Sequence, residues 1–157
     1  MQQTRGQGAP GADSPWNEIV PNLWMGGHFY QDAAGRLPAI VDGEFDVVVS
    51  LHHQDGYGPA PHVEHHYARI PDGPLAPDEI AEVSRLAAVT AAAVTAERRV
   101  LVRCHFGYNR SGLVVAQALI TMGHDTDDAI SLIRRRRSEW ALHNHLFVAY
   151  LGNGLTR

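Results

Sequence analysis

Hydrophobic and polar residues follow two different periods along this chain, one typical of strands and the other of helices. Compact β-branched runs occur at FDVVVSL (residues 45–51) and RVLVRC (residues 99–104), which is the pattern of strands buried on both faces of a sheet. The more mixed segments EIVPNLWMGG (residues 18–27) and HVEHHYARI (residues 62–70) predict two further strands. These strands are far apart in the sequence, so other elements must connect them.

Helical periodicity fills the intervals between these runs. From Pro77 onward, apolar residues recur on one stripe, and the proline and the acidic residues after it suit a helix start. Residues 111–123 are apolar almost all round and end at Gly123, which predicts a deeply buried helix. Two more helices are predicted at residues 125–139 and 142–152. Because strands alternate with helices, we predict an α/β fold: a single domain with a mainly parallel central sheet of about four to five strands flanked by helices.

The length and composition of the chain fit one soluble globular domain. With 157 residues, the chain can bury a substantial core. Residues 1–14 are rich in Gly, Gln, Pro and Ala, so we predict a flexible N-terminal tail followed by a folded domain over residues 15–157. The formal net charge of −4 gives no global argument for nucleic acid or a membrane as a partner. We expect a monomer.

Targeting signals and cysteine content bear on the location of the protein. The first residues lack the apolar core of a signal peptide, and no stretch approaches the roughly 20 apolar residues that a membrane span needs. One cysteine cannot form an internal disulfide, which suits a reducing compartment. We therefore expect a cytoplasmic protein.

The single cysteine, Cys104, lies where a predicted buried strand ends, and Ser111 lies where a predicted buried helix begins. The loop between them must turn tightly, and its backbone N–H groups can converge at the helix N-terminus to form an anion site. Gly107 permits a backbone angle or a close approach that other residues resist, and Arg110 adds a planar fork suited to two phosphate oxygens. The same positive field favours the thiolate of Cys104, which is the nucleophilic form. The pattern predicts a phosphate-binding loop that serves phosphoryl transfer.

A plainer interpretation of Cys104 is a small buried hydrophobe, since an isolated cysteine at a strand end is often no more than that. A Cys-x5-Arg spacing also occurs by chance. The preceding strand, the glycine inside the loop, the Arg-Ser pair and the apolar helix that follows together favour the catalytic interpretation.

The segment from Cys104 to Ser111, with the pattern Cys-x5-Arg-Ser after the strand VLV, resembles the signature of cysteine-dependent protein phosphatases. The compact dual-specificity-like branch of this superfamily is the most similar. Other pieces follow in the family's order: NLWMGG resembles an early segment, FDVVVSL the next strand, IPDGPLAPDEI the general-acid loop and IRRRRSEWALHNHLFVAYL the C-terminal pattern. The resemblance covers about residues 16–152 and implies a dual-specificity-phosphatase-like catalytic domain over residues 15–157.

The resemblance also implies roles for individual residues. Cys104 is the expected nucleophile, Arg110 and the loop amides the phosphate cradle, and Ser111 a hydrogen-bond donor to the sulfur. The departing oxygen needs a proton, and Asp72, in a loop flanked by Pro and Gly, is the expected general acid. The implied substrate-binding residues are those of the loop: His105, Phe106, Gly107, Tyr108 and Asn109. No metal and no cofactor is expected.

Two alternatives remain for the acid. Asp72 could simply make a turn, because Asp-Gly is strong turn chemistry. Asp55, in another loop, is the second candidate for the acid.

The implied activity is hydrolysis of a phosphomonoester through a phosphocysteine intermediate. The expected substrate is a phosphorylated protein, of the tyrosine or dual-specificity type, or a small phosphomonoester. Lipid-directed members of the family tend to carry extra lysines or arginines in the loop, whereas residues 105–109 contain no basic residue other than His105. The resemblance therefore favours these substrates over a phosphoinositide. Phe106 and Tyr108 either line the mouth of the pocket or pack into the core.

Other functions remain open as alternatives. The chain could be a phosphate-binding interaction module with little catalysis, that is, a pseudophosphatase. It could act on a non-protein phosphomonoester. A rhodanese-like sulfurtransferase also uses a loop cysteine, but its loop is usually shorter and needs no distant aspartate.

Arg103 stands where members of the family usually have a histidine. Either it supplies a positive charge in place of that histidine, or it turns to solvent and leaves His105 nearest the sulfur. The four arginines at residues 134–137 could bind anions, but we expect a solvated helix end, because at most two of them share a helix face.

Five of the ten histidines lie within residues 51–67. A metal site is conceivable, since histidine binds zinc readily. We favour a solvated or hydrogen-bonded histidine face, because successive side chains of a strand point to opposite sides. His52, His53 and Gln54 follow a predicted buried strand and are expected to rim the active site.

Overall fold

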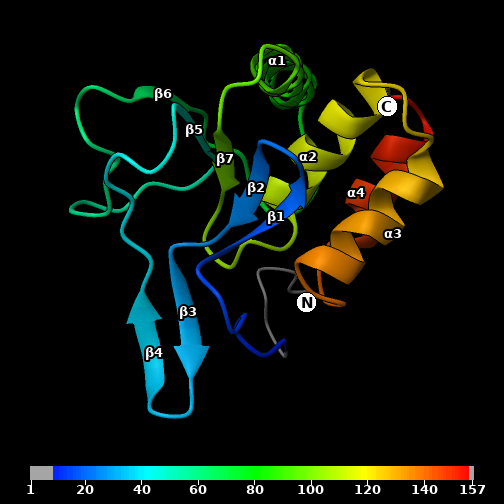
Figure 1. Ribbon diagram of the computed structural model, residues 1–157. Coiled ribbons are helices and arrows are strands. Elements are labelled where there is room, and N and C mark those ends of the chain that lie inside the picture. Colours follow the sequence, from blue (N-terminus) through cyan, green and yellow to red (C-terminus); the bar gives the residue numbers. More distant parts are fainter. Residues whose placement is uncertain (1–8, 156–157) are drawn as a thin grey trace.

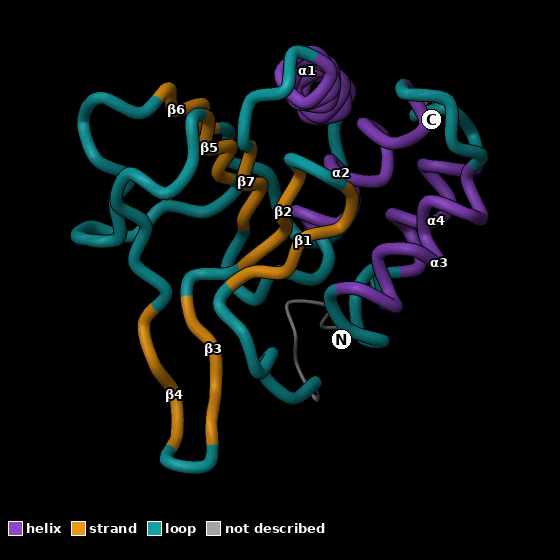
Figure 2. Tube along the Cα trace, in the orientation of Figure 1, coloured by secondary structure: helices purple, strands orange, loops and turns teal. Residues whose placement is uncertain are grey.

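The computed structural model of the protein describes residues 9–155 as a single α/β domain built on a central five-stranded sheet (Figures 1 and 2). In spatial order the strands are β1 (Trp16–Val20), β2 (Leu23–Gly26), β7 (Val100–Arg103), β5 (Val47–Ser50) and β6 (Glu64–Tyr67). Only β1 runs antiparallel to its neighbour, and the other three pairs are parallel. The predicted fold class is confirmed.

Four helices occur where the apolar periodicity predicts them: α1 (Pro77–Thr95), α2 (Arg110–Thr121), α3 (Thr126–Arg136) and α4 (His145–Gly152). Local chemistry explains their starts. Asp125 accepts a hydrogen bond from the backbone N–H of Asp128 and caps α3, while Asn144 accepts one from Leu146 and caps α4. The carboxylate of Glu79 accepts a hydrogen bond from the N–H of Ala76 and so closes the first turn of α1.

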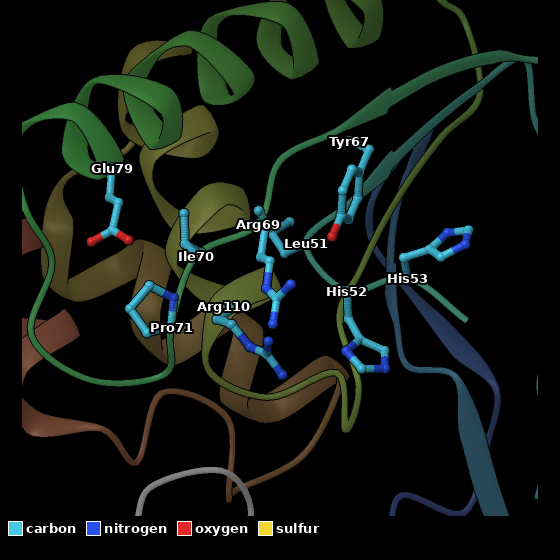
Figure 3. A pocket seen from close by; sticks show the side chains of 9 residues that line it. All are labelled: Leu51, His52, His53, Tyr67, Arg69, Ile70, Pro71, Glu79 and Arg110. Atoms are coloured by element: carbon cyan, nitrogen blue, oxygen red, sulfur yellow. The ribbon is translucent and has the colours of Figure 1, made fainter. Parts of the chain in front are cut away.

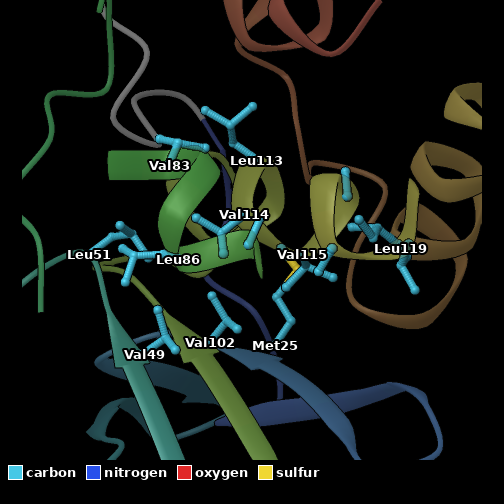
Figure 4. Close-up of a cluster of buried hydrophobic side chains, with 14 of the residues drawn as sticks. Met25, Val49, Leu51, Val83, Leu86, Val102, Leu113, Val114, Val115 and Leu119 are labelled. Atoms are coloured by element: carbon cyan, nitrogen blue, oxygen red, sulfur yellow. The ribbon is translucent and has the colours of Figure 1, made fainter. Parts of the chain in front are cut away.

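The two faces of the sheet are covered in different ways. The larger core cluster joins strand residues such as Val49 and Val102 to the apolar sides of the helices, Leu86 and Val114 among them (Figure 4). The smaller cluster lies on the other face and contains no helix residue; its buried members are Val41, Phe45, Val48, Val63 and Leu101. Helices therefore flank one face, and the loops within residues 39–63 cover the other.

Along β7 the side chains alternate between these faces. Val100, Val102 and Cys104 belong to the larger cluster, whereas Leu101 belongs to the smaller one. This alternation is the ordinary period of a strand. It places Cys104 on the helix side of the sheet and Arg103 on the opposite side.

A two-stranded hairpin, β3 (Phe29–Asp32) and β4 (Gly35–Pro38), projects from the domain (Figure 1). The sequence does not predict this hairpin, because the segment has few apolar residues and no clear alternation. The guanidinium of Arg36 lies 3.8 Å from the ring centroid of Phe29. That contact and the antiparallel pairing hold the hairpin together.

The segment of residues 1–14, expected to be a flexible tail, has two parts. Residues 1–8 lie outside the described residues. Residues 9–14, which were expected in a flexible tail, pack against the domain: Ala12 is buried, and its carbonyl accepts a hydrogen bond from the N–H of Gln31. The prediction is wrong for this part, because backbone groups of the domain supply partners that composition does not reveal. Within residues 9–155, no helix combines the length and the apolar character needed to cross a membrane.

Candidate active site

Cys104 lies immediately after β7 and is 2% exposed, and Ser111 lies in the first turn of α2. The Sγ of Cys104 and the Oγ of Ser111 are 3.3 Å apart, within hydrogen-bonding distance for sulfur. The loop of residues 104–110 therefore connects a buried strand to a buried helix, as predicted. It brings the sulfur and the hydroxyl together at the N-terminus of α2.

The path of this loop depends on two glycines. Gly107 has a φ of +78°, and a Cβ at this position would lie 2.6 Å from the carbonyl oxygen of Gly26. Gly27 approaches the loop from the end of β2, and a Cβ there would lie 2.8 Å from the carbonyl oxygen of His105. Only glycine tolerates such contacts, so the loop packs directly on the end of β2. Both reasons predicted for Gly107, backbone angle and close approach, are confirmed.

The loop retains donors for a ligand. Among the described residues, none accepts a hydrogen bond from the backbone N–H groups of Phe106, Gly107 or Tyr108. Arg110 is 6% exposed, and its guanidinium has no hydrogen bond or ion pair to any residue in the described range. N–H groups and a guanidinium beside a helix N-terminus form a site for an anion.

Arg110 opens into a cavity of about 620 Å³. Figure 3 shows its guanidinium and that of Arg69 in the same part of the cavity, with His52 beside them. The remaining lining residues are Leu51, His53, Tyr67, Ile70, Pro71 and Glu79. As predicted, His52 and His53 rim the site, whereas Gln54 does not line this cavity.

Asp72 follows Pro71 at the edge of the cavity and is 9% exposed. Its carboxylate accepts a hydrogen bond from Nδ2 of Asn109 at 3.1 Å and another from Nδ2 of Asn144 at 2.7 Å. Asn109 belongs to the phosphate-binding loop, so one side chain joins the loop to the predicted acid.

The alternative acid, Asp55, is placed differently. Its Oδ1 lies 2.8 Å from Nε2 of His53, and its side chain is fully exposed. The structure thus brings Asp72, and not Asp55, to the loop.

Both expectations for Arg103 are wrong. The residue is 2% exposed, and its guanidinium donates to the Oγ of Ser50 at 2.9 Å and to the carbonyls of Tyr57 and Gly58 at 2.9 and 2.7 Å. It neither reaches the sulfur nor turns to solvent, because strand alternation directs it to the other face of the sheet. Burial lowers the pKa of Arg103 to about 10, so the group remains a cation at neutral pH.

His28, which the sequence analysis did not identify, contacts the loop backbone. Its Nδ1 lies 2.9 Å from the carbonyl oxygen of Cys104, and its backbone N–H donates to the carbonyl of His105. Burial lowers the pKa of His28 to about 3, so the ring is neutral and Nδ1 carries the proton that it donates. No local pattern marks this histidine, which simply follows the two glycines that end β2.

Arg137 holds the same loop from another direction. Its guanidinium donates to the carbonyls of Gly107 and Phe106, each at 3.2 Å, and to the carbonyl of Ser14 and the Oδ1 of Asn17 at 2.8 and 2.9 Å. The expected solvated helix end is therefore wrong for this residue, which is 6% exposed. Burial lowers its pKa to about 10. Its position within the family's C-terminal pattern is the one sequence signal that could have identified it.

The aromatic residues of the loop do not share one environment. Tyr108 is buried, and its hydroxyl donates to the carbonyl of Pro10 at 2.6 Å, so it packs inward. Phe106 is half-buried against Phe29, with ring centroids 4.8 Å apart. The ring of His105 lies 4.8 Å from that of His52, at the cavity.

Within residues 51–67, His53, His65 and His66 have hydrogen-bond partners and His62 is exposed, in agreement with the expected solvated or hydrogen-bonded histidine face. Nε2 of His65 lies 2.8 Å from the Oγ of Ser50, and Nε2 of His66 lies 2.7 Å from Glu64. Within the part of the chain that the structure describes, no group of three His, Cys, Asp or Glu residues is arranged to hold a metal ion.

Comparison with known proteins gives a match at the level of structure. No protein-family model matches this sequence, and no curated protein matches it. Human DUSP28 has a TM-score of 0.73 at 24% sequence identity, over 93% of this chain and 96% of that chain. A mouse putative dual specificity phosphatase, complexed with zinc tungstate, has a TM-score of 0.68 at 28% identity, over 89% and 86% of the two chains. Tk-PTP in its active form has a TM-score of 0.67 at 20% identity, over 91% and 97%.

These similarities extend over almost the full length of both chains in each pair, so complete domains correspond. They show that the five-stranded α/β domain described above is the fold of these phosphatases. The chain therefore has the fold of the compact dual-specificity phosphatases within the cysteine-dependent protein tyrosine phosphatase superfamily, and it is similar to these solved structures over most of its length.

Proposed function

We propose that this protein is a phosphatase of the tyrosine or dual-specificity type, which hydrolyses phosphomonoesters through a phosphocysteine intermediate on Cys104. The observation that carries the proposal is the loop itself. Its sulfur lies 3.3 Å from the hydroxyl of Ser111, and the guanidinium of Arg110 has no described protein partner. A nucleophile beside an open anion cradle suits phosphoryl transfer.

In the first step, the thiolate of Cys104 attacks phosphorus in line with the leaving oxygen. The S–P bond forms as the P–O bond breaks, and Asp72 gives its proton to the departing oxygen. Arg110 and the loop amides bind the three equatorial oxygens, on which the charge is spread.

In the second step, Asp72 takes a proton from water, and that water attacks phosphorus. The S–P bond breaks, inorganic phosphate is released, and the hydroxyl of Ser111 donates to the sulfur as it leaves as a thiolate. Asn109 and Asn144 position Asp72 through both steps, because their amide groups hold its carboxylate.

The mouse structure supports the anion cradle. It was solved as a complex with zinc tungstate, and tungstate is a tetrahedral oxyanion similar in shape to phosphate. We expect tungstate to inhibit this protein in competition with substrate. A thiolate nucleophile must also stay unoxidised, so a reducing compartment such as the cytoplasm suits the chemistry.

The test is turnover of para-nitrophenyl phosphate by the wild-type protein and by Cys104→Ser. We expect turnover by the wild type, loss of at least about 10⁴-fold in the variant, and a phosphorylated Cys104 after an acid quench, detected by mass spectrometry. Tungstate binding without turnover would identify a phosphate-binding interaction module instead. Activity with thiosulfate and cyanide, but not with the phosphate ester, would identify a sulfurtransferase.

The substrate class needs its own comparison. A phosphotyrosine peptide, a phosphoserine peptide and a short-chain phosphatidylinositol phosphate should be assayed side by side, because PTPMT1, a neighbour of the same fold, was solved in complex with PI(5)P. We expect the phosphotyrosine peptide to have the highest kcat/KM. A preference for the lipid would replace the protein substrate in this proposal.

A further inference from the structure

A second guanidinium lines the cavity that contains Arg110. Arg69, which follows β6, is exposed, and Figure 3 shows its side chain directed toward the same space as that of Arg110. Among the described residues, none forms a hydrogen bond or an ion pair with the guanidinium of Arg69. The cavity therefore contains two permanent positive charges that no described protein group neutralises.

Three other arginines at the surface of the described chain are paired with a carboxylate. Arg85 bonds to Glu82, Arg98 to Glu64 and Arg99 to Asp46, at N–O distances of 2.9, 2.9 and 3.4 Å. Arg69 differs from them because it extends into a cavity and not along the surface. An unpaired guanidinium in a concave site is suited to a carboxylate or phosphate of a ligand.

One carboxylate, that of Glu79, also lines this cavity among the described residues. It does not pair with Arg69, since its Oε1 accepts the N–H of Ala76 at 2.7 Å and is held at the start of α1. Glu79 therefore repels an anion from the α1 side of the cavity. An anionic ligand is attracted instead to the opposite side of the cavity, where Arg69 lies near His52.

We propose that Arg69 forms a second anion subsite, which binds an acidic group close to the phosphate that Arg110 holds. This inference rests on the proposed function, because it places the reacting phosphate at Arg110. The ligand class is a phosphopeptide with an acidic side chain next to the phosphorylated residue.

Two observations favour a peptide over a lipid surface. His53 and Tyr67 line the cavity with partly exposed rings, which offer contact area to the neighbouring side chains of a peptide. The chain has a formal net charge of −4, which does not favour approach to an anionic membrane.

The experiment compares two phosphotyrosine peptides that differ only in one residue beside the phosphotyrosine, Glu in one and Gln in the other. For the wild type we expect kcat/KM to be about fivefold higher for the Glu peptide, as for a partly exposed ion pair. Arg69→Gln should abolish this preference, and Arg69→Lys should retain part of it because the charge remains. Added salt should reduce the preference in the wild type.

Arg135→Gln is the matched control, since it removes the same charge from an exposed position of α3 outside the cavity. This variant should keep the full preference for the Glu peptide. An equal loss of preference in Arg135→Gln would attribute the effect to overall charge and overturn the subsite. An unchanged preference in Arg69→Gln would overturn it too.

A binding measurement separates this inference from the proposed function. Fluorescence anisotropy of the two labelled peptides with Cys104→Ser protein, with and without Arg69→Gln, needs no turnover. If the wild type does not hydrolyse the peptides but an Arg69-dependent preference in binding persists, the subsite stands and the catalytic proposal fails. If Arg69→Gln weakens binding of a short-chain phosphatidylinositol bisphosphate and leaves both peptides unaffected, the peptide ligand is overturned.

Discussion

Arg137 and Arg110 lie beside the same loop, and each is 6% exposed, yet they differ in what they bind. Arg137 donates four hydrogen bonds to protein oxygens, including two loop carbonyls. Arg110 has no partner among the residues that the structure describes. The two residues have the same exposed fraction, but Arg137 is bonded to protein oxygens, whereas Arg110 lines the cavity and has no described protein partner.

This difference separates the structural side of the loop from its reactive side. A buried charge without a partner costs free energy, and a protein usually avoids it. On the side of Arg137, Arg103 and His28 the chain supplies the partners itself. On the side of Arg110 and Arg69 it leaves them to a ligand, so substitutions on the two sides should have opposite effects on catalysis and on stability.

The largest effect is expected for Arg110→Met. Removal of the guanidinium that binds the transferring phosphoryl group should lower kcat by about 10³- to 10⁵-fold. The free energy of unfolding should stay the same or rise, because no described protein partner is lost. Assays with para-nitrophenyl phosphate and urea unfolding of the same samples measure both quantities. A strongly destabilised variant would show that Arg110 has a structural role and would remove the contrast with Arg137.

Asp72→Asn should have the next largest effect. Loss of the general acid is expected to lower kcat by about 10²- to 10⁴-fold with a phenolic leaving group of high pKa. The loss should be smaller for difluoromethylumbelliferyl phosphate, whose leaving group needs no proton. Equal losses with both substrates would indicate that Asp72 acts only through its contacts with Asn109 and Asn144.

Arg137→Met should act mainly on stability. It leaves the carbonyls of Phe106 and Gly107 without their donor, and we expect the free energy of unfolding to fall by about 3 kcal/mol. Arg136→Met is the control, because Arg136 is exposed on the same helix. Tungstate should recover part of the lost stability by binding the folded loop. Equal unfolding midpoints for the two variants would contradict the structural role of Arg137.

The smallest effect is expected for His28 and depends on pH. The folded-state pKa of His28 is about 3, below its ordinary value of 6.5, so the folded protein holds the ring neutral. The contribution of His28 to the free energy of unfolding is complete above pH 6.5. It decreases as pH falls toward 3, because the unfolded chain takes up a proton that the folded chain does not, by up to about 1.4 kcal/mol per pH unit.

His28→Asn should therefore flatten the decline of stability between pH 6.5 and about pH 4, measured by urea unfolding. His145→Asn, at an exposed position of α4, should leave the decline unchanged. If the stability of both variants declines with falling pH as it does in the wild type, another group determines the acid sensitivity.

Much of the fold could be predicted from local patterns. Helices α1 to α4 and strands β5 and β7 have apolar runs of one clear period, and their burial follows from it. The hairpin of β3 and β4 has no such period, so nothing local revealed it. The contacts of residues 9–14 were equally hidden, because their partners lie far along the chain.

In the candidate site, too, only the residues with a local sequence pattern could be predicted. Cys104, Gly107 and Ser111 were predictable because a strand, a turn and a helix start must follow one another there. The direction of Arg103 was also predictable in principle, since strand alternation places it opposite Cys104. The role of His28 was not predictable, and the family's C-terminal pattern gave the one signal for Arg137, because both roles depend on carbonyls that only the folded chain brings to these side chains.

The four hydrogen bonds of Arg137 determine when, during synthesis, the phosphate-binding loop can acquire its support. They connect the start of the chain, at Ser14 and Asn17, to the loop at Phe106 and Gly107 through a residue close to the C-terminus. Translation proceeds from the N-terminus, so Cys104 leaves the ribosome before Arg137 does. A nascent chain therefore carries its nucleophile for a time without the hydrogen bonds that hold the loop, and it can form them only after synthesis has passed Arg137.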